Sequence, residues 1–116
     1  MKAPQFSEDW SDDFKALYYH DMQEIWDPNI APHIWNQYHN QLDIYTNIAT
    51  TSDASTILDV GCAQATLALL LAEQGYDVTA VDLRPSFLEY AKSRYTHGKI
   101  EFIAGNILED SDTWRI

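Results

Sequence analysis

The fold is decided by residues 57–65, which read Ile57-Leu58-Asp59-Val60-Gly61-Cys62-Ala63-Gln64-Ala65. Residues 56–60 are a short and mostly apolar run, which is typical of a buried strand. Small residues follow, and the stretch from Gln64 to Gln74, rich in Ala and Leu, predicts a helix. A turn from a strand into a helix brings the unpaired N–H groups of the helix start close to a ligand. Gly61 suits this turn because glycine tolerates tight backbone conformations. We therefore expect a ligand site here.

The residues after this turn continue the alternation of strands and helices. Gly75 follows the predicted helix at the C′ position, where glycine ends many helices. Residues 77–82 are dense in β-branched side chains and predict a second strand. Pro85 then opens a helix that ends near residues 96–98, and residues 100–103 predict a third strand. The order strand, helix, strand, helix, strand predicts parallel strands joined by right-handed crossovers, and therefore the α/β class.

The residues before the turn predict two helices. Ser11 is the expected N-cap of the first, which must end before Pro28 because the residue before proline disfavours helical geometry. Pro32 begins the second helix, and residues 50–55 are small and polar, as expected of a loop. Apolar side chains recur at spacings of three and four, as on one face of a helix. They are Phe14, Tyr18, Met22 and Ile25 in the first helix, and Trp35, Tyr38, Leu42, Tyr45 and Ile48 in the second.

The charge balance excludes several classes of partner. Eighteen acidic side chains against seven basic ones leave a net charge of −11, which repels nucleic acids and anionic membrane surfaces. We expect most of this charge on a solvated surface, and the alternative is that it steers a cationic ligand. The sequence has no run of about 20 apolar residues, which is the length that a membrane-spanning helix needs. Cys62 is the only cysteine, so we expect no disulfide, no metal site and a reducing, cytoplasmic environment.

An acid at the end of the second predicted strand indicates the kind of ligand. Asp82 lies 21 residues after Gly61, a spacing at which a carboxylate reaches the hydroxyls of a ribose bound across the turn. This spacing predicts a cofactor that contains a nucleoside, and the alternative is an ordinary turn with an incidental acid. Because Asp82 stands at an open strand end, we expect it to contribute little to stability.

Asp59 distinguishes between two kinds of nucleoside cofactor. An acid two residues before Gly61 would repel the two phosphates of a dinucleotide and attract an ammonium group. Small residues recur at every second position from Gly61 to Ala65, whereas the dinucleotide pattern places its third small residue where Thr66 stands. Both observations favour a cofactor with an amino-acid end over a nicotinamide dinucleotide.

With these features, the chain resembles the class I S-adenosylmethionine-dependent methyltransferases over about residues 56–108. Their first motif, acid-x-G-x-G-x-G, matches residues 59–65, their acid after the second strand matches Asp82, and a later motif matches Gly105-Asn106-Ile107. The resemblance implies S-adenosylmethionine as the cofactor and a methyltransferase that acts on a small-molecule acceptor. As the fold, it implies a partial Rossmann-like parallel sheet in strand order 3-2-1, preceded by two N-terminal helices.

The resemblance also implies how the methionine end of the cofactor is held. Asp59 would hold its ammonium group, and the backbone facing it would come from Gly61, Cys62 and Ala63. Ala63 and Ala65 stand where the family has glycine. A left-handed backbone at either position would strain alanine by ~1–2 kcal/mol.

At the adenosine end, the resemblance implies four contacts. Asp82 would accept hydrogen bonds from the two ribose hydroxyls, and Leu83 would pack on the adenine face. Asn106 would meet the adenine amino group, with Ile107 beneath the ring. Asn106 replaces the acid that is usual in the family, and its side-chain oxygen can still accept a hydrogen bond. The resemblance assigns no catalytic residue.

The number of strands leaves the function of the isolated chain open. The family's sheet has seven strands and this chain carries three, so residues 56–116 are expected to form a truncated half domain with its first strand at an edge. Such an edge favours a homodimer or a partner chain. The alternatives to an active methyltransferase are an inactive S-adenosylmethionine-binding module, a subunit that needs a partner, and a nicotinamide-dependent oxidoreductase.

Residues 1–55 are expected to form a helical segment with many large aromatic rings. One interpretation is that these rings pack the two helices onto the sheet. The other, by analogy with the family, is a lid that covers the cofactor and lines a small-molecule pocket. The rings are those of Trp10, Tyr18, Tyr19, Trp26, Trp35, Tyr38 and Tyr45.

Overall fold

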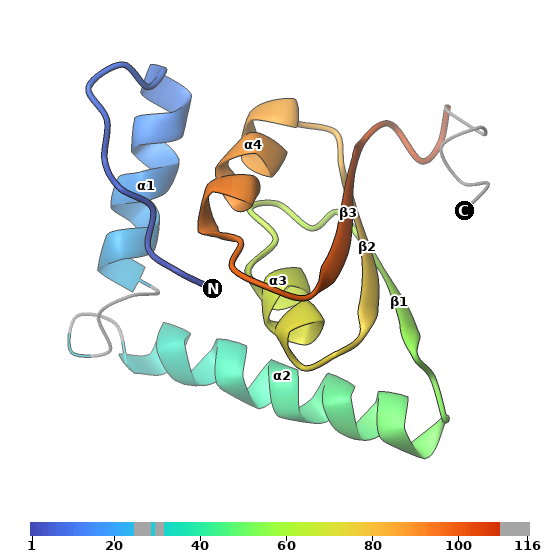
Figure 1. The fold of residues 1–116 in the computed structure, drawn as a ribbon. Coiled ribbons are helices and arrows are strands. Elements are labelled where there is room, and N and C mark those ends of the chain that lie inside the picture. Colours follow the sequence, from blue (N-terminus) through green and yellow to red (C-terminus); the bar gives the residue numbers. More distant parts are fainter. Residues whose placement is uncertain (25–28, 30–31, 110–116) are drawn as a thin grey trace.

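The computed structural model describes residues 1–24, 29 and 32–109 (Figure 1). Its elements are, in order, α1 (Asp12–Glu24), α2 (Pro32–Thr51), β1 (Thr56–Val60), α3 (Thr66–Glu73), β2 (Asp77–Asp82), α4 (Pro85–Arg94) and β3 (Lys99–Ala104). Ile25, Trp26 and Pro28, which the sequence places at the end of the first helix, lie outside the described residues. In the described part of the chain, none of the helices combines the length and the apolar composition that crossing a membrane needs.

The three strands form one parallel sheet with β2 in the middle, in the order β1-β2-β3. In the last shared row, Val60 pairs with Val81, and Val81 pairs with Ile103. The predicted α/β class is therefore confirmed, together with the strand order 3-2-1 and the two helices that precede the sheet. The carboxyl ends of all three strands meet at one edge of the sheet, where α/β proteins bind their ligands.

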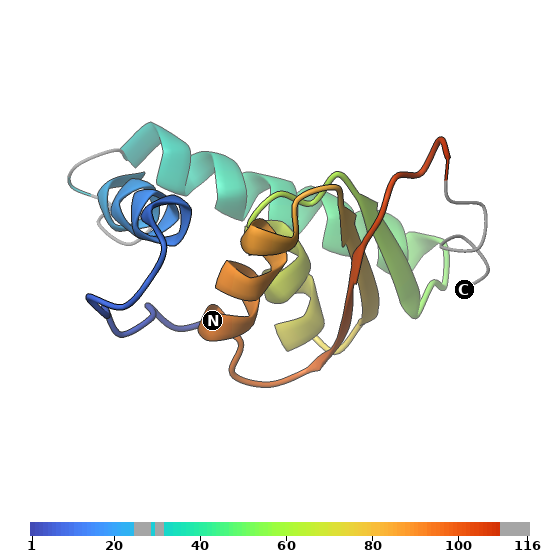
Figure 2. The ribbon, with the colours of Figure 1, turned by 90° about the horizontal axis from the view of Figure 1, so that it is seen from above.

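The described helices gather on one face of the sheet (Figure 2). On β1, which forms one edge, Ile57 is partly buried against the core, whereas Leu58 and Val60 point the other way and stay exposed. The core lies between α3, β2 and α4, where small side chains let helix and strand approach closely. Its buried members are Ala65, Ala68, Leu71, Ala72, Val78, Ala80 and Ala91.

The N-terminal segment packs on this α/β unit through α1 and α2. The Ser11 hydroxyl oxygen accepts a hydrogen bond from the Phe14 N–H at 3.2 Å, which confirms Ser11 as the N-cap of α1. The Phe14 ring then meets the buried Tyr90 ring of α4 edge-on, with centroids 5.3 Å apart. Several rings contact one another around α1, those of Phe6, Trp10, Phe14, Tyr18 and Tyr19.

Helix α2 runs further than predicted and includes Thr50 and Thr51, which the sequence assigns to a loop. Their hydroxyls donate hydrogen bonds at 2.8 Å to the carbonyls of Thr46 and Asn47, one turn earlier. Threonine can satisfy its hydroxyl inside a helix in this way. The loop predicted from the polar composition of residues 50–55 is therefore wrong for Thr50 and Thr51.

Helix α3 begins at Thr66, two residues later than predicted. Ala63 and Ala65 adopt φ values of 52° and 58°, and a right-handed helix cannot include such residues. The predicted end holds: Gly75, with φ 102°, donates its N–H to the Ala72 carbonyl at 3.0 Å. Strand β3 is one residue longer at each end than the predicted 100–103.

Candidate functional site

A cavity of about 530 Å³ opens at the carboxyl ends of the three strands. This volume is within the range of small-molecule sites. Five of the eight residues assigned from the sequence lie around it, namely Gly61, Asp82, Leu83, Asn106 and Ile107. The other lining residues are Val60, Val81, Arg84, Gly105 and Leu108.

The Asp82 carboxylate is 4% exposed and fully engaged in hydrogen bonds. Its Oδ2 accepts the Ala63 N–H at 2.8 Å and its Oδ1 accepts the Arg84 N–H at 3.0 Å. The Arg84 side chain donates two more hydrogen bonds, from Nε to Oδ1 at 3.0 Å and from Nη2 to Oδ2 at 3.3 Å. Burial works to raise the pKa of Asp82, but the hydrogen bonds from Arg84 and Ala63 outweigh it, so the pKa lies below its usual value.

These contacts correct the expectation that Asp82 matters little for stability. The carboxylate is buried, and it holds the N–H of Ala63 across the turn between β1 and α3. Sequence reasoning also missed Arg84, which lines the cavity and pairs with Asp82. Its position two residues after the acid is the signal that could have found it.

The turn between β1 and α3 is held against the end of β2. The N–H groups of Gly61 and Cys62 both donate to the Val81 carbonyl, at 2.8 and 3.0 Å. Gly61 has φ 71°, and a Cβ built on it meets nothing within 4 Å. The space beside this glycine is therefore open, as a turn that lets a ligand approach the backbone requires.

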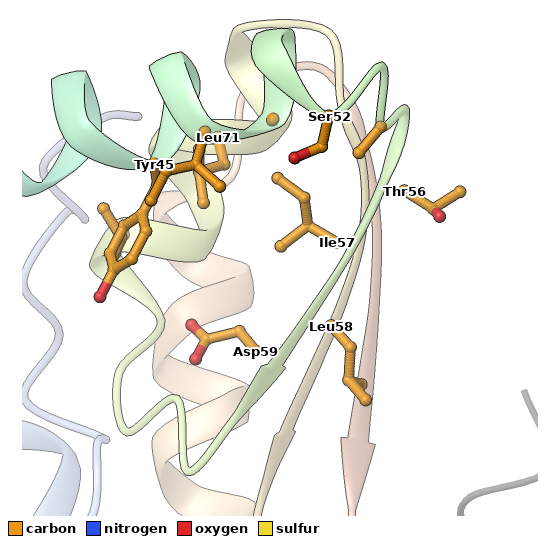
Figure 3. A pocket seen from close by; sticks show the side chains of 11 residues that line it. Tyr45, Ser52, Thr56, Ile57, Leu58, Asp59 and Leu71 are labelled. Atoms are coloured by element: carbon orange, nitrogen blue, oxygen red, sulfur yellow. The ribbon is translucent and has the colours of Figure 1, made fainter.

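Asp59 lies on the helix-facing side of β1, apart from the cavity at the strand ends. It pairs with Ala80, which shares its face of β2 with Asp82. Figure 3 shows its carboxylate pointing from β1 toward the helices, into a second cavity of about 390 Å³ that Tyr45 and Leu71 also line. Burial raises the pKa of Asp59, and the nearby negative charge of Asp82 raises it further.

Cys62 and Ala63, the other two assigned residues, line neither of these cavities. Burial, with the charges of Asp59 and then Asp82, raises the pKa of the Cys62 thiol to about 12. A thiol with this pKa stays protonated at neutral pH, so it is a poor nucleophile. The contribution of Cys62 and Ala63 is therefore their backbone.

Leu83 and Ile107 line the cavity and expose apolar surface. The Asn106 Oδ1 accepts the Leu108 N–H at 2.9 Å, which leaves this oxygen one further acceptor position. The Gly105 N–H donates to the Asp82 carbonyl at 3.0 Å and ties this loop to β2. Apolar surface and a hydrogen-bonding amide beside a buried carboxylate suit a flat, polar-edged ring joined to a sugar.

Ala63→Gly should raise the free energy of unfolding by about 0.5–1 kcal/mol. Relief of left-handed strain, ~1–2 kcal/mol for alanine, exceeds the roughly 0.5–1 kcal/mol of extra chain entropy that glycine loses on folding. Urea unfolding measures the difference. Ala65→Gly is the matched control, because its φ is similar but its methyl is fully buried. At Ala65, losing the buried methyl group costs about 0.8 kcal/mol, which should cancel the gain from relieved strain. A less stable Ala63→Gly would contradict this account.

The chain is similar in sequence and in fold to known methyltransferases. Residues 57–113 match the family model of the methyltransferase domain. A segment of 55 residues is 40% identical to malonyl-[acyl-carrier protein] O-methyltransferase from Acetivibrio thermocellus. The segment covers 46% of this chain and 19% of that protein, so the match spans less than a fifth of the relative's length.

Two solved structures show the same fold. The methyltransferase domain of bacterial CtHen1 aligns with a TM-score of 0.54 and 23% identity, over 66% of this chain and 44% of that one. CalS10, an amino pentose methyltransferase from Micromonospora echinaspora with S-adenosylmethionine bound, aligns with a TM-score of 0.52 and 20% identity, over 88% and 38%. Residues 57–113 therefore match part of a methyltransferase domain in sequence, and the three-stranded parallel sheet with its helices has the Rossmann-like methyltransferase fold.

Proposed function

We propose that this chain binds S-adenosylmethionine in the cavity at the strand ends, as the cofactor-binding part of an enzyme that methylates a small molecule. The observation that carries the proposal is the convergence of five assigned residues on one cavity. They come from the carboxyl end of β2 and from the turns after β1, β2 and β3. The small-molecule acceptor is supported by CalS10, which is named as an amino pentose methyltransferase.

The residues around the cavity fit the adenosine part of this cofactor. Asp82 supplies a buried, ionised carboxylate for the ribose, and Leu83 with Ile107 supplies apolar surface for the adenine. The remaining acceptor position of the Asn106 oxygen suits the adenine amino group. The open space beside Gly61 lets the cofactor approach the backbone of the turn.

The charges of the site fit the methionine part. Asp59 lies on the same face of the neighbouring strands as Asp82, and its negative charge attracts an ammonium group, whereas the charge of Asp82 is paired with Arg84. S-adenosylmethionine supplies a methyl group that is already activated on a sulfonium. The chain's task is therefore to orient the cofactor and keep water from it, rather than to activate the methyl group.

Calorimetric titration tests the choice of cofactor. We expect S-adenosylmethionine and its demethylated product to bind, and NAD to bind weakly or not at all. Tight NAD binding would show that Asp59 does not exclude phosphates and would favour the oxidoreductase.

The alternative function is an inactive binding module, or a subunit that needs a partner. It is supported by β1, which pairs with β2 alone within the described residues and leaves Leu58 and Val60 exposed. An edge of this kind can take a second copy or a partner strand. Light scattering reports a homodimer, and a methyl-transfer assay with and without added lysate separates the cases. Transfer by the purified chain alone would remove this alternative.

Asp82→Ala should weaken S-adenosylmethionine binding by about one to two orders of magnitude. Hydrogen bonds to a charged acceptor contribute roughly 1.5–3 kcal/mol, and ~1.4 kcal/mol is one decade in affinity. Stability should also fall, by about 1–3 kcal/mol, since the Ala63 N–H loses its acceptor. Calorimetry and urea unfolding measure the two effects.

Asp77→Ala is the matched control for this prediction. Asp77 begins the same strand and pairs with Lys99 at 3.0 Å, far from the cavity. It should leave the affinity unchanged. If Asp82→Ala binds the cofactor as well as the parent chain does, the ribose assignment is wrong.

A further inference from the structure

The Asp82 carboxylate has no acceptor position left for a ribose. A carboxylate offers about four lone-pair positions, two on each oxygen. Oδ1 accepts the N–H and the Nε of Arg84, and Oδ2 accepts the Ala63 N–H and the Nη2 of Arg84. The two backbone donors belong to the turn and the strand end. The other two donors come from a single side chain.

We propose that Arg84 is a latch on the ribose site, whose guanidinium must leave Asp82 before a nucleoside can bind there. This inference rests on the proposed function, in which the ribose hydroxyls donate to Asp82. The exchange is balanced, because two O–H donors replace two N–H donors and each carboxylate oxygen gives up one. The backbone bonds from Ala63 and Arg84 remain and keep the carboxylate in place.

The surroundings of Arg84 allow this exchange. Its side chain is 54% exposed, in contrast to the 4% of Asp82. Its guanidinium carbon lies 3.8 Å from the centroid of the Phe87 ring, on the first turn of α4. A cation over an aromatic face is attracted to it, so the guanidinium keeps a favourable contact after it leaves the carboxylate.

The latch lowers the affinity for any nucleoside that carries ribose hydroxyls. An ion pair with one half-exposed partner is weak, and its loss corresponds to roughly a two- to fivefold change in affinity. The latch therefore tunes binding rather than preventing it. It acts on the ribose alone, and this distinguishes it from a residue that contacts the adenine.

The test compares two ligands on two proteins. Arg84→Met keeps an unbranched, apolar side-chain stem but has no side-chain donor for Asp82. We expect adenosine to bind this variant about two to five times more tightly than the parent chain. 2′,3′-Dideoxyadenosine has no hydroxyl to compete for Asp82, so its affinity should be the same for both proteins. Titration followed by NMR measures these affinities.

Lys99→Met is the matched control, because it removes a cation paired with Asp77 at the far end of β2. It should change neither affinity. An equal change for both ligands with Arg84→Met, no change for either, or weaker adenosine binding overturns the latch. Arg84→Ala replaces the methionine variant if circular dichroism shows that the latter does not fold. If S-adenosylmethionine and adenosine bind neither parent nor variant, the proposed function itself fails.

Discussion

Asp21→Ala is expected to lower the free energy of unfolding by about 3–5 kcal/mol. Asp21 of α1 and Arg94 of α4 are both 0% exposed, and Arg94 Nη1 lies 2.9 Å from Asp21 Oδ2. Burial lowers the pKa of Arg94, and Asp21 opposes this by favouring the charged form. Without Asp21, the guanidinium is a buried cation with no counter-ion. Since the free energy of unfolding of a small domain is only about 5–15 kcal/mol in total, Asp21→Ala should remove much of the stability.

Two controls separate the buried charge from a general loss of contacts. Glu89 forms an exposed ion pair with Lys92 on α4, with Lys92 Nζ 2.9 Å from the carboxylate. Glu89→Ala breaks this pair and should change the free energy of unfolding by about 0.5 kcal/mol or less. The double variant Asp21→Leu with Arg94→Met removes both buried charges and should recover part of the loss. A loss below about 1 kcal/mol for Asp21→Ala in urea unfolding would mean that Asp21 does not compensate Arg94.

The buried pair of Asp21 and Arg94 also links the N-terminal segment to the turn of the candidate site. Arg94 donates to the Gln64 carbonyl, and to the Thr66 hydroxyl at 2.9 Å. The Gln64 side-chain amide donates in turn to Asp21 at 3.3 Å. Helix α1 is therefore fixed to the start of α3 by buried polar contacts as well as by aromatic packing. The aromatic rings alone, as seen in the sequence, did not suggest this link.

Much of the α/β unit could be predicted because its signals are local. The alternation of apolar runs and the positions of Gly75 and Pro85 mark the strands and helices, and parallel strands bring their carboxyl ends together. This is why residues assigned from three separate motifs, such as Gly61, Asp82 and Asn106, surround one cavity.

The parts that could not be predicted depend on conformation or on distant partners. The sequence shows that Ala63 and Ala65 replace glycines, but not that both adopt positive φ and delay α3. Asp82 is buried, and one of its four hydrogen bonds comes from Ala63, in a turn 19 residues earlier in the chain. The partnership of Asp21 with Arg94 joins helices from opposite ends of the chain, and no local pattern marks it.

Gly98→Ala is expected to lower the free energy of unfolding by about 2–5 kcal/mol. Gly98 has φ 103° and immediately precedes β3, where the chain passes the last turn of α3. A Cβ there would lie 2.4 Å from the Ala72 carbonyl oxygen and 2.7 Å from its carbon. Left-handed strain adds ~1–2 kcal/mol, and forcing a methyl into occupied space adds about 1–3 kcal/mol.

The clash cannot be relieved cheaply, because the obstructing atoms are backbone. The Ala72 carbonyl accepts the Gly75 N–H that closes α3, so moving it disturbs the end of the helix that carries the core. Gly75→Ala separates strain from clash, since its φ is 102° and a Cβ there meets nothing within 4 Å. It should show the strain alone, ~1–2 kcal/mol. Equal losses for the two variants in urea unfolding would mean that β3 and α3 can move apart without penalty.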